Sequence, residues 1–181
     1  VTAGLGVDSI TLTETTAAID TVIMTTGGAV GVTTIVGFNV AAAASDGDNI
    51  DIDLSDLNGL VTNMQTGDGT YLAATAAPTI TAVAVGAYDL GGANSDILAL
   101  AGNIACLSAL ETALESGGSH ALTLDDADGS FAGEDGYLFL WDDGTTSHLS
   151  YVSFDADPGN NTVFAADSAT AVDLIEFTSI A

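Results

Sequence analysis

Residues Tyr137 to Phe154, which read YLFLWDDGTTSHLSYVSF, contain the strongest folding signal in this chain. Two runs of aromatic and aliphatic residues flank the segment Asp142-Asp143-Gly144-Thr145. Aspartate and glycine are the residues that a tight turn between paired strands prefers. We therefore predict an antiparallel hairpin with strands at residues 137–141 and 149–154.

Short β-type segments also fill the first half of the chain. They are rich in β-branched residues and separated by Gly and Asp, and they lie at residues 10–12, 21–24, 33–36 and 50–54, with a further strand at 79–85. The segment 50–54 alternates apolar and acidic residues, which predicts a strand with one packed face and one solvated face.

One segment of the second half has helical periodicity. Residues 94–116 follow Gly91-Gly92 and place an apolar stripe at Ile104, Leu107, Leu110 and Leu114. Gly117-Gly118 predicts the end of this helix. The last segment, residues 173–180, is apolar at both ends and fits either a final strand or a short helix.

These signals together predict a mainly β protein of two parts. Residues 1–77 form an Asp/Gly-rich β domain, a solenoid or a sandwich, with turns of the calcium-binding type. Residues 78–181 form a β-rich domain with one helix, at roughly residues 104–116, and the C-terminal hairpin. A chain of 181 residues can bury a substantial core, and its single cysteine excludes an internal disulfide.

The charge of the chain is entirely one-sided. It has 25 Asp and Glu residues and no Lys or Arg, which gives a formal net charge of −25. Repulsion on this scale opposes a compact state, yet 48% hydrophobic residues and a mean hydropathy of +0.44 indicate a folded chain. Bound cations reconcile the two, and the 20 Asp against 5 Glu favour oxygen-rich turns around Ca²⁺. We predict calcium as the cofactor.

The same charge restricts the partners and the location. Without cationic side chains the surface has no means of neutralising phosphates, so we expect neither nucleic acid nor anionic membrane as a partner. Saturating calcium is found outside cells, so we predict a secreted, extracellular or cell-surface protein. A halophilic cytoplasm is the other environment in which acidic surfaces of this kind occur.

The first candidate calcium site is the segment Ala3-Gly4-Leu5-Gly6-Val7-Asp8-Ser9-Ile10-Thr11. It matches the calcium-binding nonapeptide G-G-x-G-x-D-x-U-x except that Ala3 replaces the first glycine. Gly4 and Gly6 would turn backbone carbonyls inward, and Asp8 would supply a carboxylate. The alternative is an ordinary Gly-rich turn before a strand.

Two further acidic clusters are candidate sites. In the first, Asp46 and Asp48 precede Asp51 and Asp53, two side chains on the same face of a predicted strand, where a shared cation would relieve their repulsion. The alternative is a solvated edge strand. The second cluster contains Asp126 and Asp128, and its alternative is an acidic loop.

Several of these segments resemble a known family. The segments Asp20-Thr21-Val22-Ile23, Ile35 to Asn39 and Asp48 to Ser55 are similar to RTX (repeats-in-toxin) proteins, which bind calcium and leave the cell by type I secretion. Residues 105–123 and 137–140 resemble the C-terminal regions of secreted surface-layer, matrix and adhesin-like bacterial proteins. The resemblance implies folding with calcium after export and a secretion signal at the C-terminus, and it carries over only Gly4, Gly6 and Asp8 as ligands. Asp20 is a further candidate metal ligand. The chain departs from the family because it has no tandem array of nonapeptides.

The expected function is therefore structural and not enzymatic. We expect acidic, β-rich subunits that bind calcium and form a homo-oligomer or polymer, as a surface layer or extracellular filament, with cell-surface polysaccharide as a further partner. The alternatives are a calcium-binding adhesin module and the secretion-targeting end of a larger exoprotein. His120 and His148 lack the sequence pattern of a catalytic site, and Cys106 is expected to pack as a small apolar residue beside the helix stripe.

Overall fold

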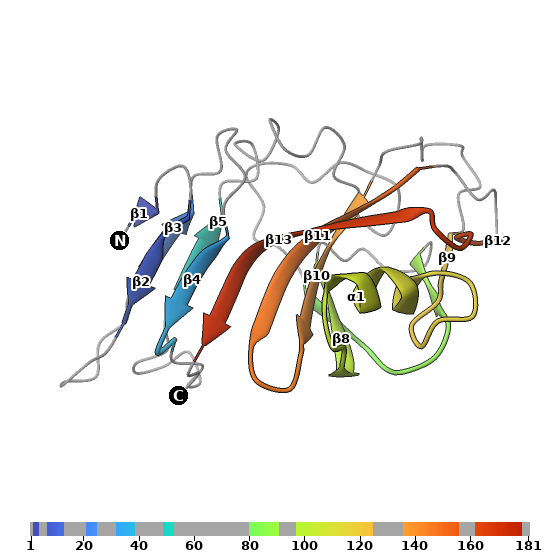
Figure 1. Cartoon of the computed structure of the whole chain (residues 1–181), viewed down its shortest axis with the longest axis horizontal. Helices are drawn as coiled ribbons and strands as arrows, with labels where there is room; N and C mark the ends of the chain where they lie inside the picture. The colour runs from blue at the N-terminus through green and yellow to red at the C-terminus, as the bar shows by residue number, and fades with distance from the viewer. Residues whose placement is uncertain are drawn as a thin grey trace.

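The computed structural model describes residues 2–3, 7–12, 21–24, 32–38, 49–52, 80–90, 97–124, 136–155 and 162–178. Within these ranges the chain is mainly β, as predicted, with one helix and strands arranged in three sheets (Figure 1). The hairpin of residues 137–154 lies near the middle of the largest sheet.

The largest sheet has seven strands in the order β2-β4-β13-β11-β10-β8-β6. Its antiparallel centre is formed by β10, β11 and β13, and the pairs towards both edges are parallel. In sheet order the strands are β2 (Ser9–Thr11), β4 (Thr33–Val36), β13 (Ala169–Thr178), β11 (Ser147–Phe154), β10 (Gly136–Asp142), β8 (Ile97–Asn103) and β6 (Ile80–Val83).

Two three-stranded sheets accompany the large one. The first is parallel and contains β1 (Thr2–Ala3), β3 (Thr21–Met24) and β5 (Asn49–Ile52). The second contains β12 (Thr162–Val163), β9 (Leu122–Leu124) and β7 (Tyr88–Asp89).

The two faces of the large sheet contribute to two separate apolar clusters. On one face, Leu110 and Leu114 of helix α1 (Leu107–Leu114) belong to the same buried cluster as Phe139 and Val152. On the other, Val22 of β3 joins the cluster that contains Ile10, Ile35 and Ile175. Alternating residues of each central strand therefore enter different cores, which explains why the hairpin is apolar on both sides.

The hairpin prediction is confirmed in register and in turn. Tyr137 pairs with Val152, and Trp141 pairs with His148. In the turn, the Asp143 backbone N–H donates to the Thr146 carbonyl at 3.0 Å. Gly144 has a φ of 96°, a left-handed conformation that glycine adopts without the strain that a Cβ introduces.

The helix is shorter than predicted. Residues 97–103, expected to be helical, form β8, and α1 covers only Leu107–Leu114. The run Ile97-Leu98-Ala99-Leu100 lies between β10 and β6 and buries side chains on both faces of the sheet, and periodicity alone does not distinguish such a run from a buried helix. The helix ends at Leu114, two residues before the predicted Ser116, and the predicted stop follows it, with Gly117 at a φ of 85°. A Cβ at Gly118 would lie 2.2 Å from the Thr112 carbonyl oxygen.

The expectation for Cys106 is wrong. Cys106 is the N-cap residue of α1 and is exposed. The helix begins one residue later, and its buried stripe contains Leu110 and Leu114, so Cys106 lies outside that stripe. Its Sγ lies 3.2 Å from Ser108 Oγ. This hydrogen bond is the largest cause of a pKa lowered from the usual 9.0 of a cysteine thiol.

Helix α1 also supplies acceptors to the backbone of β13. Strand β4 pairs with β13 only from Ile175 to Thr178, so the first part of β13 lies beyond the end of its neighbour. There the buried carboxylate of Glu115 accepts hydrogen bonds from the N–H groups of Asp167 (3.0 Å) and Ala169 (2.8 Å). Glu111, one helical turn earlier, accepts from Ala171 N at 2.8 Å. The two glutamates thus bind the edge of β13 as a strand would.

The remaining strand predictions agree with β2, β3, β4, β5 and β6, and the C-terminal segment is a strand within β13. The large sheet joins β2 and β4, from the predicted first domain, to β13 near the end of the chain. The division at residue 77 itself stays a prediction, and one sheet spans it.

Candidate functional site

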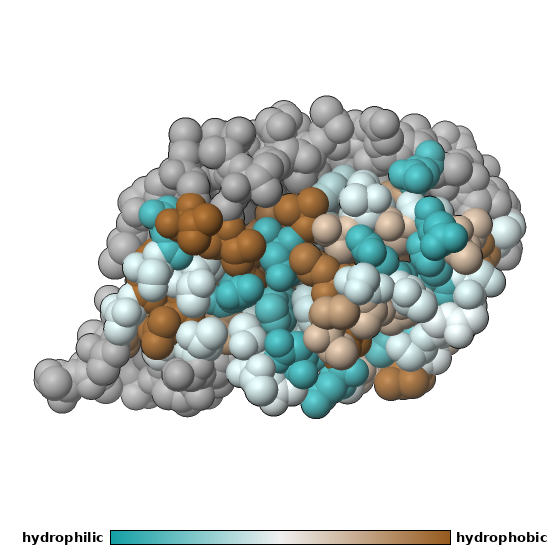
Figure 2. Space-filling model, viewed as in Figure 1, coloured by the Kyte–Doolittle hydropathy of each residue, from teal (hydrophilic) through white to brown (hydrophobic). Residues whose placement is uncertain are grey.

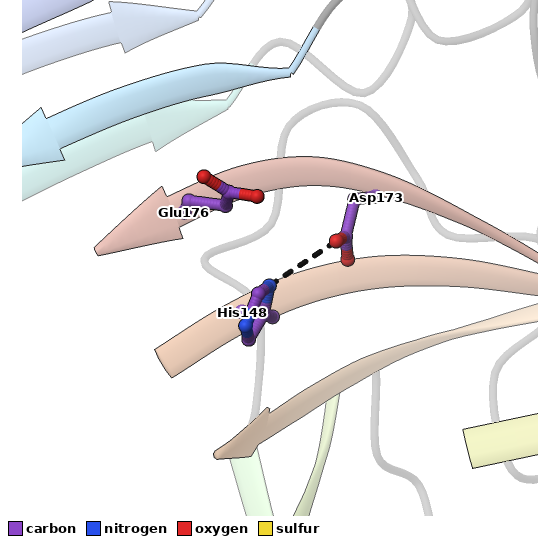
Figure 3. A group of neighbouring side chains, drawn as sticks. All are labelled: His148, Asp173 and Glu176. Atoms are coloured by element: carbon purple, nitrogen blue, oxygen red, sulfur yellow. Dashed lines mark hydrogen bonds and ion pairs between the residues drawn. The ribbon is translucent and has the colours of Figure 1, made fainter. Parts of the chain in front are cut away.

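A group of buried polar side chains in the described part of the chain lies on the central strands of the large sheet. His148 and Ser150 lie two residues apart on β11 and share one face. Asp173 and Glu176 of the neighbouring β13 meet them, since Ser150 pairs with Asp173 and His148 pairs with Glu176. Figure 3 shows the side chains of His148, Asp173 and Glu176 gathered on these two strands.

An irregularity in β13 creates this arrangement. Asp173 and Glu176 are three residues apart, so regular alternation would place them on opposite faces of the sheet. The register shifts between Leu149, which pairs with Ile175, and Ser150, which pairs with Asp173, so that Leu174 is an extra residue in β13. The bulge turns both acidic side chains to the face of His148, an effect that bulges commonly have beside functional sites.

A chain of hydrogen bonds fixes the orientation of these groups. Trp141 Nε1–H donates to Ser150 Oγ at 2.7 Å, and Ser150 Oγ–H donates to Asp173 Oδ1. The second oxygen, Asp173 Oδ2, lies 3.1 Å from His148 Nδ1. The His148 ring stacks on Trp141, with ring centroids 4.2 Å apart and planes inclined by 12°. His148, Ser150, Asp173 and Trp141 are all buried.

The order of these contacts differs from that of an activated nucleophile. In a serine hydrolase the histidine takes the proton of the serine hydroxyl, and the aspartate holds the histidine from behind. Here the Ser150 hydroxyl donates to Asp173, and the imidazole contacts the other oxygen of the same carboxylate. The arrangement orients a carboxylate and an imidazole towards each other, and the serine supports them.

The set of donors suits a metal ion. His148, Asp173 and Glu176 each offer one ligand atom, and these atoms lie within 4.8 Å of one another. Figure 2 shows hydrophilic surface along the middle of the face on which α1 also lies, between more hydrophobic areas. Glu176 is half-buried, whereas His148 and Asp173 are 6% and 9% exposed.

A second carboxylate lies on the opposite side of the imidazole. Asp143 Oδ2 is 3.6 Å from His148 Nε2. The other oxygen, Asp143 Oδ1, accepts hydrogen bonds from the Thr145 hydroxyl, Thr145 N and Thr146 N, each at 2.7 Å. These bonds, that of the Thr145 hydroxyl first, lower the pKa of Asp143 from 3.8 to about 2. Asp143 thus forms part of the predicted turn and also lies close to His148.

Asp8, one of the predicted calcium ligands, has a carboxylate oxygen in a buried position. It precedes β2, and its backbone carbonyl accepts a hydrogen bond from Thr34 N at 2.9 Å. Its carboxylate oxygen Oδ2 is buried and has no hydrogen-bond partner among the residues that the structure describes. A buried carboxylate oxygen without a donor is costly in the absence of a proton or a cation.

Asp51 is the other predicted ligand within the described residues. Asp51 lies in β5, where it pairs with Ile23 of β3. The group of described side chains that could share a metal ion, His148, Asp173 and Glu176, includes neither Asp8 nor Asp51. The positions outside the described residues are Gly4, Gly6, Asp20, Asp46, Asp48, Asp53, Asp126 and Asp128.

The sequence interpretation did not single out Asp173 and Glu176, and it gave His148 no role. No short-range signal connects them, since His148 and Asp173 are 25 residues apart and meet only through the pairing of β11 with β13. The one available clue was the pair of acidic residues in the otherwise apolar segment Val172 to Phe177.

Comparison with protein-family models, curated proteins and solved structures finds no match to this chain. Among the described residues there is no helix with the length and apolar content needed to cross a membrane.

Proposed function

We propose that this protein is a secreted, non-enzymatic structural protein whose acidic subunits bind calcium and assemble with one another at the cell surface or in an extracellular filament or layer. The observation that carries the proposal is the net charge of −25 on a chain without Lys or Arg that nevertheless buries two apolar cores. A folded chain of this composition depends on external cations.

Asp8 gives the calcium part of the proposal a specific place. Its buried Oδ2 lacks a donor among the described residues, and it occupies the aspartate position of the nonapeptide-like segment that begins at Ala3. A calcium ion at this turn would satisfy that oxygen. Asp8 directly precedes β2, an edge strand of the large sheet, so binding at Asp8 would stabilise that edge.

The opposite edge suits contact between copies. Strand β6 ends the sheet order, and Ile80 within it is 60% exposed, as is Val85 just beyond it at 66%. An apolar edge strand is a ready site for pairing with another strand. Two copies of this chain carry the same negative charge and repel each other, so assembly requires a cation that screens or bridges their carboxylates.

Sedimentation velocity tests this proposal on the full chain. Calcium should convert a monomer into larger species, and EGTA should reverse the change. Ile80→Lys should reduce association, because a charge on an edge strand opposes pairing. Ala165→Lys, which adds the same charge at another exposed position, should leave it intact. Monomer alone at saturating calcium would contradict self-assembly and favour the alternative, a calcium-binding adhesin module or secretion-targeting end.

Calorimetry tests the calcium site separately. Asp8→Asn should lower the number of bound calcium ions by one. Asp167→Asn removes the same charge from an exposed residue with a φ of 60°, a conformation that asparagine tolerates, and should bind calcium like the wild type. Equal stoichiometry in Asp8→Asn and wild type would exclude Asp8 as a ligand.

A further inference from the structure

His148 faces a carboxylate on each side of its ring. Nδ1 is 3.1 Å from Asp173 Oδ2, and Nε2 is 3.6 Å from Asp143 Oδ2. A neutral imidazole carries a proton on only one nitrogen, so either tautomer directs a lone pair at one of these carboxylates. Nε2 is buried and has no hydrogen-bond partner in the described part of the chain. A metal ion on one nitrogen, with the proton on the other, would leave neither carboxylate facing a lone pair.

The nitrogen that faces the cluster is Nδ1. Glu176 lies opposite His148 in the pairing of β13 with β11, and one ligand atom from each of His148, Asp173 and Glu176 lies within 4.8 Å of the others. Ligand atoms around a tetrahedral ion with bonds of about 2.1 Å are about 3.4 Å apart. The separation of 3.1 Å between His148 Nδ1 and Asp173 Oδ2 is close to that value. Among the described residues, the Glu176 carboxylate has no hydrogen bond that would have to break when its side chain turns to the ion.

We propose that His148 Nδ1, Asp173 Oδ2 and one carboxylate oxygen of Glu176 bind a divalent transition-metal ion of the Zn²⁺ class. The donor set decides the class of ion. One imidazole nitrogen with two carboxylates and an open fourth position suits Zn²⁺ or Co²⁺, whereas Ca²⁺ takes six to eight oxygen ligands. This site is separate from the calcium sites of the proposed function.

The surrounding contacts hold the ligands in place for the ion. Trp141 stacks on the His148 ring and donates to Ser150, and Ser150 holds Asp173 Oδ1, which leaves Oδ2 for the metal. With a metal on Nδ1, Nε2 would carry the proton on the side of Asp143, whose Oδ2 lies 3.6 Å away and would have to approach to accept it. A carboxylate that accepts from the far nitrogen of a metal-bound histidine is a regular feature of zinc sites.

Binding at this position would join β11 to β13 beside the bulge at Leu174. The ion would also neutralise two carboxylates in a chain that has no cationic side chain. The expected consequence is a Zn²⁺-dependent rise in stability that is additional to any effect of calcium.

A Co²⁺ titration followed by visible absorption tests the site on the full chain, stripped of metal and then held in excess Ca²⁺ so that sites made only of oxygen ligands are filled. We expect one Co²⁺ per chain, displaced by Zn²⁺. Glu176→Gln should weaken binding by at least about ten-fold, and Asp143→Asn by a similar factor. The control Asp167→Asn, which removes an exposed carboxylate elsewhere, should bind like the wild type.

Nitrogen-15 NMR of the histidine rings provides a second readout that does not depend on variants. Zn²⁺ should shift the Nδ1 resonance of His148 while Nε2 keeps its proton. Co²⁺ binding that is unchanged in Glu176→Gln would overturn the proposal. So would a His148 ring that carries protons on both nitrogens with and without Zn²⁺, since a proton alone would then occupy the position. Neither result bears on calcium-dependent assembly, and failure of that assembly leaves the Zn²⁺ result intact.

Discussion

The buried residue Glu115 contributes to the fold through two hydrogen bonds whose loss can be measured as a change in stability. Its carboxylate is 6% exposed and accepts hydrogen bonds from Asp167 N at 3.0 Å and Ala169 N at 2.8 Å. Glu115→Gln keeps one acceptor oxygen and replaces the other with an amide that cannot accept. One buried N–H therefore loses its partner, and the remaining bond loses the assistance of the charge.

The cost follows from these two bonds. A hydrogen bond to a charged group contributes about 1.5–3 kcal/mol, so we expect Glu115→Gln to lower the free energy of unfolding by about 2 kcal/mol. Glu115→Ala, which loses both bonds, should cost about 4 kcal/mol. Removing one negative charge from an anionic chain relieves repulsion and should raise the stability. A fall in stability would therefore report the lost hydrogen bonds.

Urea unfolding monitored by circular dichroism measures both effects, with calcium as the only divalent metal. Glu176→Gln is the matched control, because it removes one negative charge at a half-buried residue whose carboxylate accepts no hydrogen bond from the described residues. It should leave the stability unchanged or slightly raised. A shift in the midpoint of about 1 M is expected for Glu115→Gln. If Glu115→Gln is as stable as Glu176→Gln, the glutamate does not hold the edge of β13.

Three other predictions concern single residues. Hydrogen bonds depress the pKa of Asp143 from 3.8 to about 2, so its contribution to stability is present above about pH 4 and is lost as the pH falls towards 2. The difference in stability between wild type and Asp143→Ala, followed by acid titration, should therefore shrink over that window. Ser108→Ala should raise the pKa of Cys106 towards 9.0 and slow its alkylation by iodoacetamide near neutral pH, whereas an unchanged rate profile would exclude this hydrogen bond as the cause. Gly118→Ala should destabilise the chain by about 1–3 kcal/mol in thermal unfolding, because the new Cβ would lie 2.2 Å from the Thr112 carbonyl oxygen, and a wild-type melting temperature would contradict that clash.

Much of the β structure was predictable because it depends on local signals. The hairpin of β10 and β11 combines apolar strands with an Asp-Gly turn, and both parts are short-range features of the sequence. The same holds for the short strands of the first half, which glycine and aspartate separate. The helix was overextended at its start because residues 97–100 are apolar at every position, and only their place between β10 and β6 makes them a strand.

The candidate metal site was not predictable by the same means. His148, Asp173 and Glu176 meet through strand pairing and a bulge at Leu174, and neither follows from local periodicity. Residue spacing even argued against the site, since Asp173 and Glu176 would face opposite sides of a regular strand. Composition, in contrast, predicts a need for external cations, and that prediction depends on no particular contact.

The central claim is that divalent cations complete this anionic fold and its assembly. The most direct test is to record the melting temperature and the sedimentation profile of one preparation at low ionic strength, first with calcium and then after EGTA. We expect calcium to raise the melting temperature and to produce associated species, and EGTA to reverse both. An unchanged melting temperature and an unchanged sedimentation profile after chelation would contradict the claim.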